Sequence, residues 1–123
     1  MRDTVILSIR PEYAQGIFEG SKKYEFRKKG FSAKVRKIIV YVTRPVGMVV
    51  GEFYVDGIDL GSPLEIWTKC RHVAGISEKA FFEYYKGCAI AFAIRIQQAH
   101  RYLNPLKISD FCKRPPQSFC YLR

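Results

Sequence analysis

The sequence predicts an α+β fold in which a small mixed β barrel carries helices packed at its ends. Short apolar or β-branched runs recur along the 123 residues, and helical patterns separate them, so several strands must pair with partners distant in sequence. Glycines interrupt one long run at Gly51 and Gly57, where bulges or bends would curl a sheet. With 48% hydrophobic residues the chain can build one core, and we interpret residues 1–123 as a single domain.

The first helix and the strands around it follow from local signals. Val5 to Ile9 is a β-branched, apolar run typical of a buried strand. Pro11 suits the first turn of a helix, which Gly20 should end. The apolar stripe of that helix, interpreted as core, consists of Tyr13, Ala14, Ile17 and Phe18. The elements that follow are predicted as a strand from about residue 22, a loop at 30–33, a strand over 37–43, a turn at 46–47 and a strand over 48–58.

A helical insertion is expected in the second half of the chain. Ser62 as N-cap, Pro63 at the first helical position and Glu65 in a capping box predict a helix start. Leu64, Trp67 and Cys70 are expected to share the buried face of this helix. Ser77 opens a second helix, whose apolar stripe consists of Ala80, Phe81, Tyr84 and Tyr85. The chain then returns to a long strand over 89–100, a short turn from 109 and a terminal strand over 119–122.

The octet Gly20 to Arg27 places one acidic and several basic side chains directly after a helix stop. The period of a strand sends Tyr24 and Phe26 to one face and the charged Glu25 and Arg27 to the other. Lys22 lies at the mouth of the strand, where the turn can swing it toward the charged face. A Lys-Glu-Arg cluster is therefore expected here. The alternative is an ordinary ion pair on a solvated sheet, which contributes little to stability.

The spacing Gly20-x-Lys22-x-x-Glu25-x-Arg27 resembles the signature of ASCH domains, which are related to PUA domains. The resemblance covers nearly the whole chain and includes the segments 41–45, 50–53 and 115–119. It implies a PUA-like mixed β pseudobarrel. In that fold the cleft between barrel and helices is the usual ligand site, and the signature strand lines it.

The net charge of +10 is concentrated in one stretch of the chain. Between Ser21 and Lys37 there are eight Lys and Arg residues and a single acid, Glu25. Such a basic stripe is typical of polyanion binding, most often to nucleic acid, although it can also be a solvated face that aids solubility. We predict that phosphate contacts come from Lys23, Lys28, Lys29, Lys34, Arg36 and Lys37.

The charged cluster can recognise a nucleotide without catalysis. Lys22 and Arg27 can donate to phosphate or to base carbonyls, and Glu25 can accept from an exocyclic amine such as cytosine N4. An aromatic side chain would add stacking. The further ligand-binding candidates are Tyr41, Thr43 and Tyr121, whereas Trp67 lies on the expected buried stripe and is discounted. The sequence thus predicts a domain that binds RNA, or a modified nucleobase or nucleoside. A regulatory role is compatible with this prediction.

Catalysis is the alternative, with Lys22 and Glu25 as the catalytic groups. One bacterial branch of the ASCH domains hydrolyses the amide of N4-acetylcytidine, using the signature lysine, a threonine where this chain has Glu25, and a downstream glutamate. Thr43 is the nearest hydroxyl by segment, and Glu52 and Glu65 are candidates for the downstream acid. Other family members have been linked to RNA cleavage, for which Lys22, Glu25 and Arg27 could supply acid, base and phosphate stabilisation.

Other classes of site find no support in the composition. The cysteines at 70, 88, 112 and 120 and the histidines at 72 and 100 match no zinc pattern, so no metal is expected and the thiols are interpreted as reduced and structural. No phosphate loop or dinucleotide fingerprint is present, and no cofactor is expected. The chain has neither a signal-like nor a membrane-spanning apolar run, which favours a cytoplasmic location without membrane contact. A protein partner docked on the basic face is a third possible role, and the oligomeric state is left open.

Overall fold

The structure is a computed structural model that describes residues 3–32 and 34–122. Its strands form one six-stranded sheet in the order β2-β5-β4-β3-β1-β6. Only β1 and β3 pair in parallel, and every other neighbouring pair is antiparallel. The strands are β1 (Thr4–Ile9), β2 (Tyr24–Arg27), β3 (Lys37–Val42), β4 (Met48–Gly61), β5 (Ala91–Leu106) and β6 (Phe119–Tyr121).

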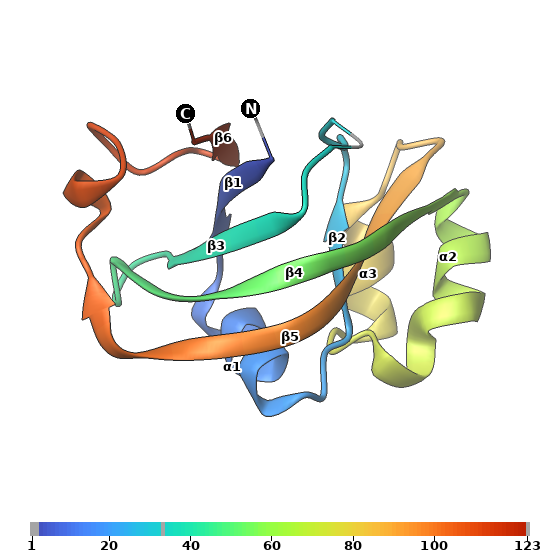
Figure 1. Ribbon diagram of the computed structural model, residues 1–123. Coiled ribbons are helices and arrows are strands. Elements are labelled where there is room, and N and C mark those ends of the chain that lie inside the picture. Colours follow the sequence, from blue (N-terminus) through green and yellow to red (C-terminus); the bar gives the residue numbers. More distant parts are fainter. Residues whose placement is uncertain (1–2, 33, 123) are drawn as a thin grey trace.

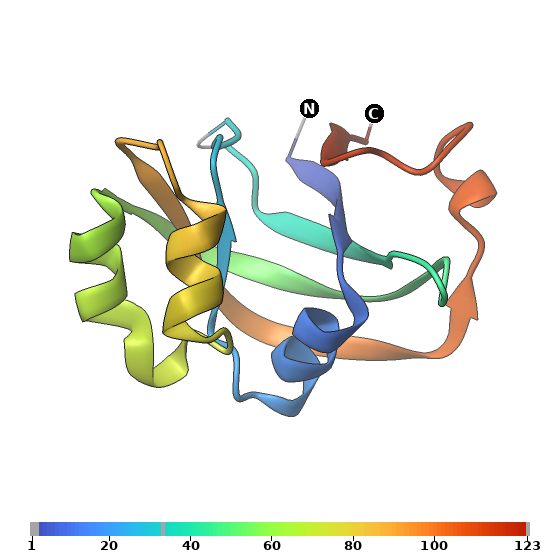
Figure 2. The same cartoon turned by 180° about the vertical axis from the view of Figure 1, so that it is seen from behind.

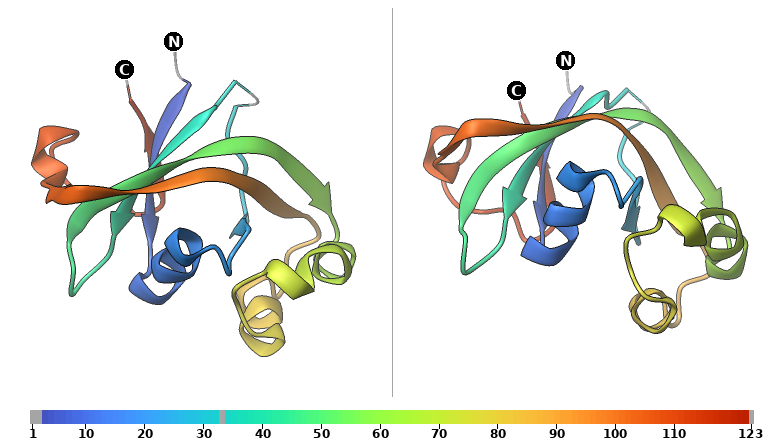
Figure 3. Two further views of the ribbon diagram at one scale, coloured as in Figure 1. Left: turned by 60° about the horizontal axis from the view of Figure 1, so that its bottom comes forward. Right: turned by 90° about the horizontal axis from the view of Figure 1, so that it is seen from below.

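The sheet is strongly curled, and helices cover it on its concave side (Figures 1 and 3). The long strands β4 and β5 arch over α1 (Pro11–Glu19), while α2 (Pro63–Cys70) and α3 (Glu78–Tyr84) lie together at one end of the sheet. Short 3-10 turns complete the chain at Arg71–Val73 and Ile108–Asp110. The predicted α+β pseudobarrel with helices at its ends is confirmed.

The helix boundaries follow the predicted signals. Gly20 ends α1 in the left-handed conformation at φ 92°, and its N–H donates to the carbonyls of Gly16 and Ile17. Ser62 and Glu65 form the predicted capping box at the start of α2. Ser77 caps α3 by accepting a hydrogen bond from the N–H of Ala80.

The buried face of α2 differs from the prediction. Ile66 and Cys70 are the buried residues of this helix, and Leu64 is 66% exposed. Ile66 and Cys70, an i, i+4 pair, share the face that packs on the core, and Leu64 lies two positions before Ile66, on a different face of the helix. Trp67 packs at the border of that core, and its indole N–H donates to Glu78.

The two longest strands extend further than their composition predicts. β4 continues to Gly61, and β5 runs from Ala91 to Leu106 although much of its second half is exposed. Their mutual pairing, from Gly61 opposite Ala91 to Val49 opposite Leu106, sets these lengths. Register shifts occur beside Gly51 and across Gly57, as predicted for bulge positions. The predicted loop at 30–33 has no regular structure over 30–32, and residue 33 lies outside the described residues.

The core is divided between the inside of the arch and two neighbouring layers. One cluster joins β1, β3 and α1, and includes Val5, Leu7 and Ile17. A second lies between β2, β5 and the helices α2 and α3, around Phe81 and Tyr85. A third, around Ile6 and Val49, packs under the C-terminal segment. Within the described residues no helix is long and apolar enough to span a membrane.

The reactivity of the Cys70 thiol provides a test of the packing in the second core cluster. Its side chain is fully buried, and burial raises the pKa of its thiol to about 11. Because the thiolate is the reactive form, we expect iodoacetamide at pH 8 to leave Cys70 unmodified in the native protein and to label it after unfolding. Mass spectrometry of labelled peptides measures this, with the half-buried Cys88 as the internal comparison. Equal labelling rates for the two cysteines in the native protein would contradict this packing.

Candidate functional site

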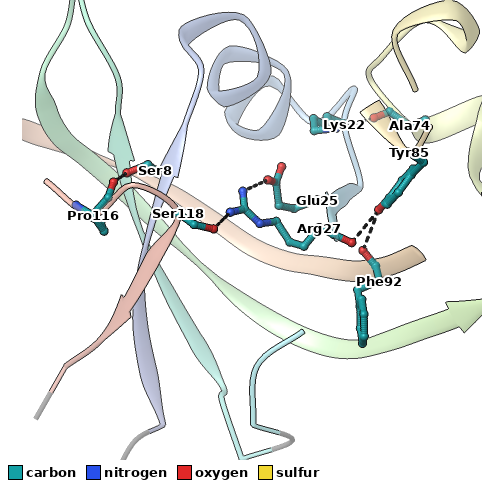
Figure 4. A network of polar contacts seen from close by, with 9 residues as sticks. All are labelled: Ser8, Lys22, Glu25, Arg27, Ala74, Tyr85, Phe92, Pro116 and Ser118. Atoms are coloured by element: carbon teal, nitrogen blue, oxygen red, sulfur yellow. Dashed lines mark hydrogen bonds and ion pairs between the residues drawn. The ribbon is translucent and has the colours of Figure 1, made fainter. Parts of the chain in front are cut away.

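The two edges of the curled sheet approach each other without pairing. β2 and β6 are the end strands of the sheet order, and within the described residues no backbone ladder joins them. Side chains cross the gap instead. The guanidinium of Arg27 donates to Ser118 Oγ (Figure 4), and the ring centres of Phe31 and Phe119 lie 5.0 Å apart. We call this line of contact between β2 and the β1–β6 edge the seam.

A pocket of about 470 Å³ opens beside the seam. Its lining residues come from the end of β1, the start of α1, β2 and α3, and Figure 2 shows how these elements are arranged. Its volume is within the range of small-molecule sites, roughly 300–1,000 Å³. Its polar lining consists of Ser8, Arg10, Lys22, Glu25, Arg27 and Glu83. Its apolar lining consists of Ile9, Tyr13, Phe26, Ile76, Ala80 and Tyr84. This cavity is called the site pocket below.

Glu25 and Arg27 form the charged wall of the site pocket. Arg27 Nη1 lies 3.4 Å from Glu25 Oε2, and the two side chains are only 14% and 8% exposed. Tyr24 and Phe26 lie on the opposite face of β2 and stack on each other at 6.2 Å in the second core cluster, although Phe26 also borders the pocket. The predicted alternation along β2 is confirmed. A shielded ion pair of this kind keeps its electrostatic strength better than one in water.

Lys22 is the most buried charged side chain of the site pocket, with 3% exposure. Its Nζ donates to the carbonyl of Ala74 at 2.8 Å and lies 5.1 Å and 4.8 Å from the ring centres of Tyr13 and Phe26. Burial lowers the pKa of Lys22, and the neighbouring charge of Glu25 opposes this shift. The predicted swing of Lys22 toward the charged face of β2 is wrong, because the carbonyl of Ala74 and the ring of Phe26 hold its ammonium on the Phe26 side, as strict alternation requires. Lys22 nevertheless lines the same pocket as Glu25.

The segment that precedes α3 holds Lys22 in place. The carbonyl of Val73 accepts a hydrogen bond from the N–H of Lys23 at 2.8 Å, and the carbonyl of Ala74 accepts one from the ammonium of Lys22. Gly75 has a φ of +63°, and a β-carbon there would lie 2.4 Å from Lys22 Cβ. The chain passes Lys22 so closely that only glycine fits at this position.

Two tyrosines of α3 and its cap support the Arg27 end of β2. The hydroxyl of Tyr85 donates to the carbonyls of Arg27 at 2.9 Å and of Phe92 at 3.4 Å (Figure 4). Burial raises the pKa of both Tyr84 and Tyr85, so both stay protonated at neutral pH. Tyr84 lines the site pocket, and Lys28 Nζ lies 4.8 Å from its ring centre. An aromatic wall with a cation beside it can hold a stacked base.

The other ligand-binding candidates do not line the site pocket. Tyr41 is 6% exposed and belongs to the third core cluster, because the β3 strand that carries it is central in the sheet. Thr43 follows β3, and its backbone N–H donates to Ile9. Tyr121 lies on β6, where its hydroxyl accepts a hydrogen bond from the N–H of Ser32 across the seam. The aromatic wall is formed instead by Tyr13, Phe26 and Tyr84.

The predicted phosphate-contacting side chains are placed on the surface, but not on one face of it. Lys37 is half-buried, and its ammonium lies 3.4 Å from Glu52, which also accepts a hydrogen bond from Tyr102. Lys28 directly follows Arg27 at the site pocket. The exposed members of the set are Lys23, Lys28, Lys29, Lys34 and Arg36.

Several pocket residues gave no signal in the sequence. Ser8 and Ser118 are single hydroxyls more than 100 residues apart, and β1–β6 pairing alone brings them to one place. Arg10 and Glu83 look like ordinary surface charges of helices. The helical stripe of Tyr84 and Tyr85 was interpreted as core, which holds for Tyr85, whereas Tyr84 faces the pocket. No group of three His, Cys, Asp or Glu side chains suited to a metal exists in the described part of the chain.

Comparison with known proteins identifies the family. Residues 7–100 match the ASCH domain. The chain belongs to the ASCH domain family. A relative from Zymomonas mobilis, named ASCH domain-containing ribonuclease, is 33% identical over 99% of this chain and 86% of its own length. The crystal structure of ASCH from Zymomonas mobilis has 30% sequence identity and a TM-score of 0.87, covering 100% of this chain and 90% of that one.

ASCH-like sequence also occurs within longer proteins. The large ribosomal subunit protein uL22 of Ureaplasma parvum serovar 3 is 34% identical over 98% of this ASCH chain. This chain spans 40% of the length of that relative. In the present ASCH domain, three of the four charged residues of the signature octet, Lys22, Glu25 and Arg27, meet at one pocket.

Proposed function

We propose that this ASCH domain binds single-stranded RNA and holds one of its nucleotides in the site pocket. The observation that carries the proposal is that three shielded charges, Lys22, Glu25 and Arg27, line one cavity together with aromatic rings. Arg27 can donate to a phosphate, Glu25 can accept from a base amine, and the rings can stack on the base. We propose residues 1–123 as one domain for this purpose.

Two further observations support RNA as the ligand class. The net charge of +10 favours a polyanion, and exposed cations such as Lys28 lie next to the pocket. The Zymomonas mobilis relative is named a ribonuclease. Fluorescence anisotropy with labelled single-stranded RNA, duplex RNA and tRNA at several salt concentrations tests the proposal. Binding should weaken steeply with salt, and no binding to any of the three at low salt would sink the proposal.

Glu25 is the residue through which base preference can be tested. If its carboxylate accepts from an exocyclic amine, Glu25→Gln should remove the preference for cytosine or adenine over uracil while overall RNA affinity holds or rises, because a negative charge near phosphate is removed. Each bidentate base contact contributes roughly 1–3 kcal/mol of discrimination. Competition with a panel of homopolymers and nucleosides measures the preference.

Glu52→Gln is the matched control for that experiment. Glu52 is also a partly buried carboxylate in an ion pair at 3.4 Å, but it lies outside the site pocket. This control should leave base preference unchanged. If Glu25→Gln lowers the melting temperature and leaves preference intact, then Glu25 only orders Arg27, and its recognition role is wrong.

RNA cleavage is a second candidate function, favoured by the name of the Zymomonas mobilis relative. In this proposal Glu25 takes the proton from an attacking hydroxyl, Lys22 donates a proton to the leaving oxygen, and Arg27 stabilises the charge on phosphorus oxygens. Incubation with labelled RNA and, separately, with N4-acetylcytidine distinguishes cleavage, amide hydrolysis and binding alone. The control for contaminating nucleases is a Lys22→Met protein purified in the same way. If this variant cleaves RNA as fast as the wild-type protein, cleavage at this site is excluded.

A further inference from the structure

Two residues of the C-terminal segment 113–118, Pro116 and Ser118, contact side chains that line the site pocket. Ser8, which lines the pocket, donates through Oγ to the carbonyl of Pro116 at 2.6 Å, and its N–H donates to the carbonyl of Ser118 at 3.0 Å. Arg27 donates to the hydroxyl of Ser118 from the opposite side of the seam (Figure 4). These contacts fix the segment beside the pocket from both edges of the sheet.

This segment carries cations that face solvent. Lys113 and Arg114 are exposed, and within the described residues neither takes part in an ion pair. On the other flank of the pocket, Lys28 lies against Tyr84. A nucleic-acid strand that enters the pocket between these flanks would have cations near the phosphates on both sides of the bound nucleotide.

The basic residues 34–37 lie elsewhere. The backbone N–H groups of Arg36 and Lys37 donate to the carbonyl of Asp3, beside the start of β1. The site pocket instead takes Ser8 and Ile9 from the end of that strand. A strand rises about 3.3 Å per residue, so these positions are separated by roughly 20 Å along β1. The basic stripe of the sequence is therefore divided in space, and only its first part reaches the pocket.

We propose that Lys113 and Arg114 form a second phosphate-binding flank of the site pocket, opposite Lys28, and that the ligand is an RNA strand continuing on both sides of the bound nucleotide. The proposal rests on the RNA-binding function proposed above. It assigns the phosphate contacts to a segment near the end of the chain rather than to residues 34–37. Charge complementarity and the contacts of Pro116 and Ser118 with Ser8 favour this occupant.

The salt dependence of RNA binding tests this assignment. For single strands, the slope of log K against log salt falls by about 0.7 for each phosphate that the protein no longer neutralises. The double variant Lys113→Ser/Arg114→Ser should therefore reduce the slope by about 1.4 and weaken binding to an octanucleotide on the order of tenfold at low salt. The double variant Lys34→Ser/Arg36→Ser removes the same charge from two exposed cations that are likewise absent from the ion pairs of the described residues, and it should leave the slope unchanged.

A series of RNA lengths provides a second readout. Wild-type affinity should rise from mononucleotide to octanucleotide, and the Lys113→Ser/Arg114→Ser protein should lose most of that gain while binding the mononucleotide normally. If both double variants give the same slope and the same length series, the second flank is overturned although RNA binding stands. If the wild-type protein binds no RNA, the proposed function itself fails before the variants are compared.

Discussion

Gly75→Ala is expected to destabilise the protein by about 2–5 kcal/mol and to abolish ligand binding at the site pocket. The left-handed backbone at φ +63° costs an alanine about 1–2 kcal/mol. The new β-carbon would also lie 2.4 Å from Lys22 Cβ and 3.0 Å from Lys22 Cα, and relieving such overpacking costs about 1–3 kcal/mol more. Either Lys22 or the segment 73–75 must move, so the ammonium loses its position at the carbonyl of Ala74 and in the site pocket.

Gly87→Ala is the matched control, because Gly87 has a φ of +82° with no atom within 4 Å of an added β-carbon. This substitution should lower the free energy of unfolding only by the cost of the left-handed backbone, about 1–2 kcal/mol, and should leave RNA binding intact. Urea denaturation gives both free energies of unfolding, and anisotropy gives the affinities. Equal decreases in stability and in binding in the two variants would show that the contact between Gly75 and Lys22 has no functional role.

Lys22→Met is expected to weaken RNA binding about ten- to a hundredfold, since hydrogen bonds to charged groups contribute about 1.5–3 kcal/mol. The fold should change little in stability, within about 1 kcal/mol, because a buried charge is replaced by an apolar side chain of similar shape. Methionine keeps the packing between the rings of Tyr13 and Phe26. Lys23→Met, a change at the neighbouring exposed lysine, should reduce affinity far less.

The pH dependence of binding gives an independent measure of Lys22. Burial lowers its pKa from the ordinary 10.5, so its ammonium deprotonates at lower pH than that of an exposed lysine. Wild-type affinity should decrease as the pH rises through this lowered pKa, and the decrease should persist in Lys23→Met. In Lys22→Met the same pH range should give a flat profile. Oligonucleotides with 2′-O-methyl groups allow the measurement at alkaline pH, and identical profiles in all three proteins would contradict a role for the charged form of Lys22.

Features determined by short-range interactions could be predicted from the sequence. The stop at Gly20 and the capping box of Ser62 and Glu65 each depend on residues within one helical turn, and both are confirmed. The alternation along β2 depends only on the period of a strand. For the same reason the site side chains Lys22, Glu25 and Arg27, which are close in sequence, were predicted to cluster, and the structure brings them to one pocket.

Features determined by distant pairing could not be predicted. The lengths of β4 and β5 result from their mutual ladder: the local pattern predicts a strand only as far as residue 100, whereas β5 continues to Leu106. The residues around Tyr41 do not show whether its ring is buried or exposed. The position of β3 between β1 and β4 buries it. Ser8 and Ser118 become neighbours only once β6 has paired with β1, across most of the chain.

The seam has a consequence for the kind of RNA that can reach the pocket. The β2 and β6 edges are joined by side chains such as Arg27 and Ser118, and within the described residues no backbone ladder between them has to break. If the domain binds RNA as proposed, a strand can cross the seam by displacing side chains alone, with the rest of the RNA outside in both directions. Under that proposal, an internal nucleotide of a long or even circular RNA is as accessible to this domain as a terminal one.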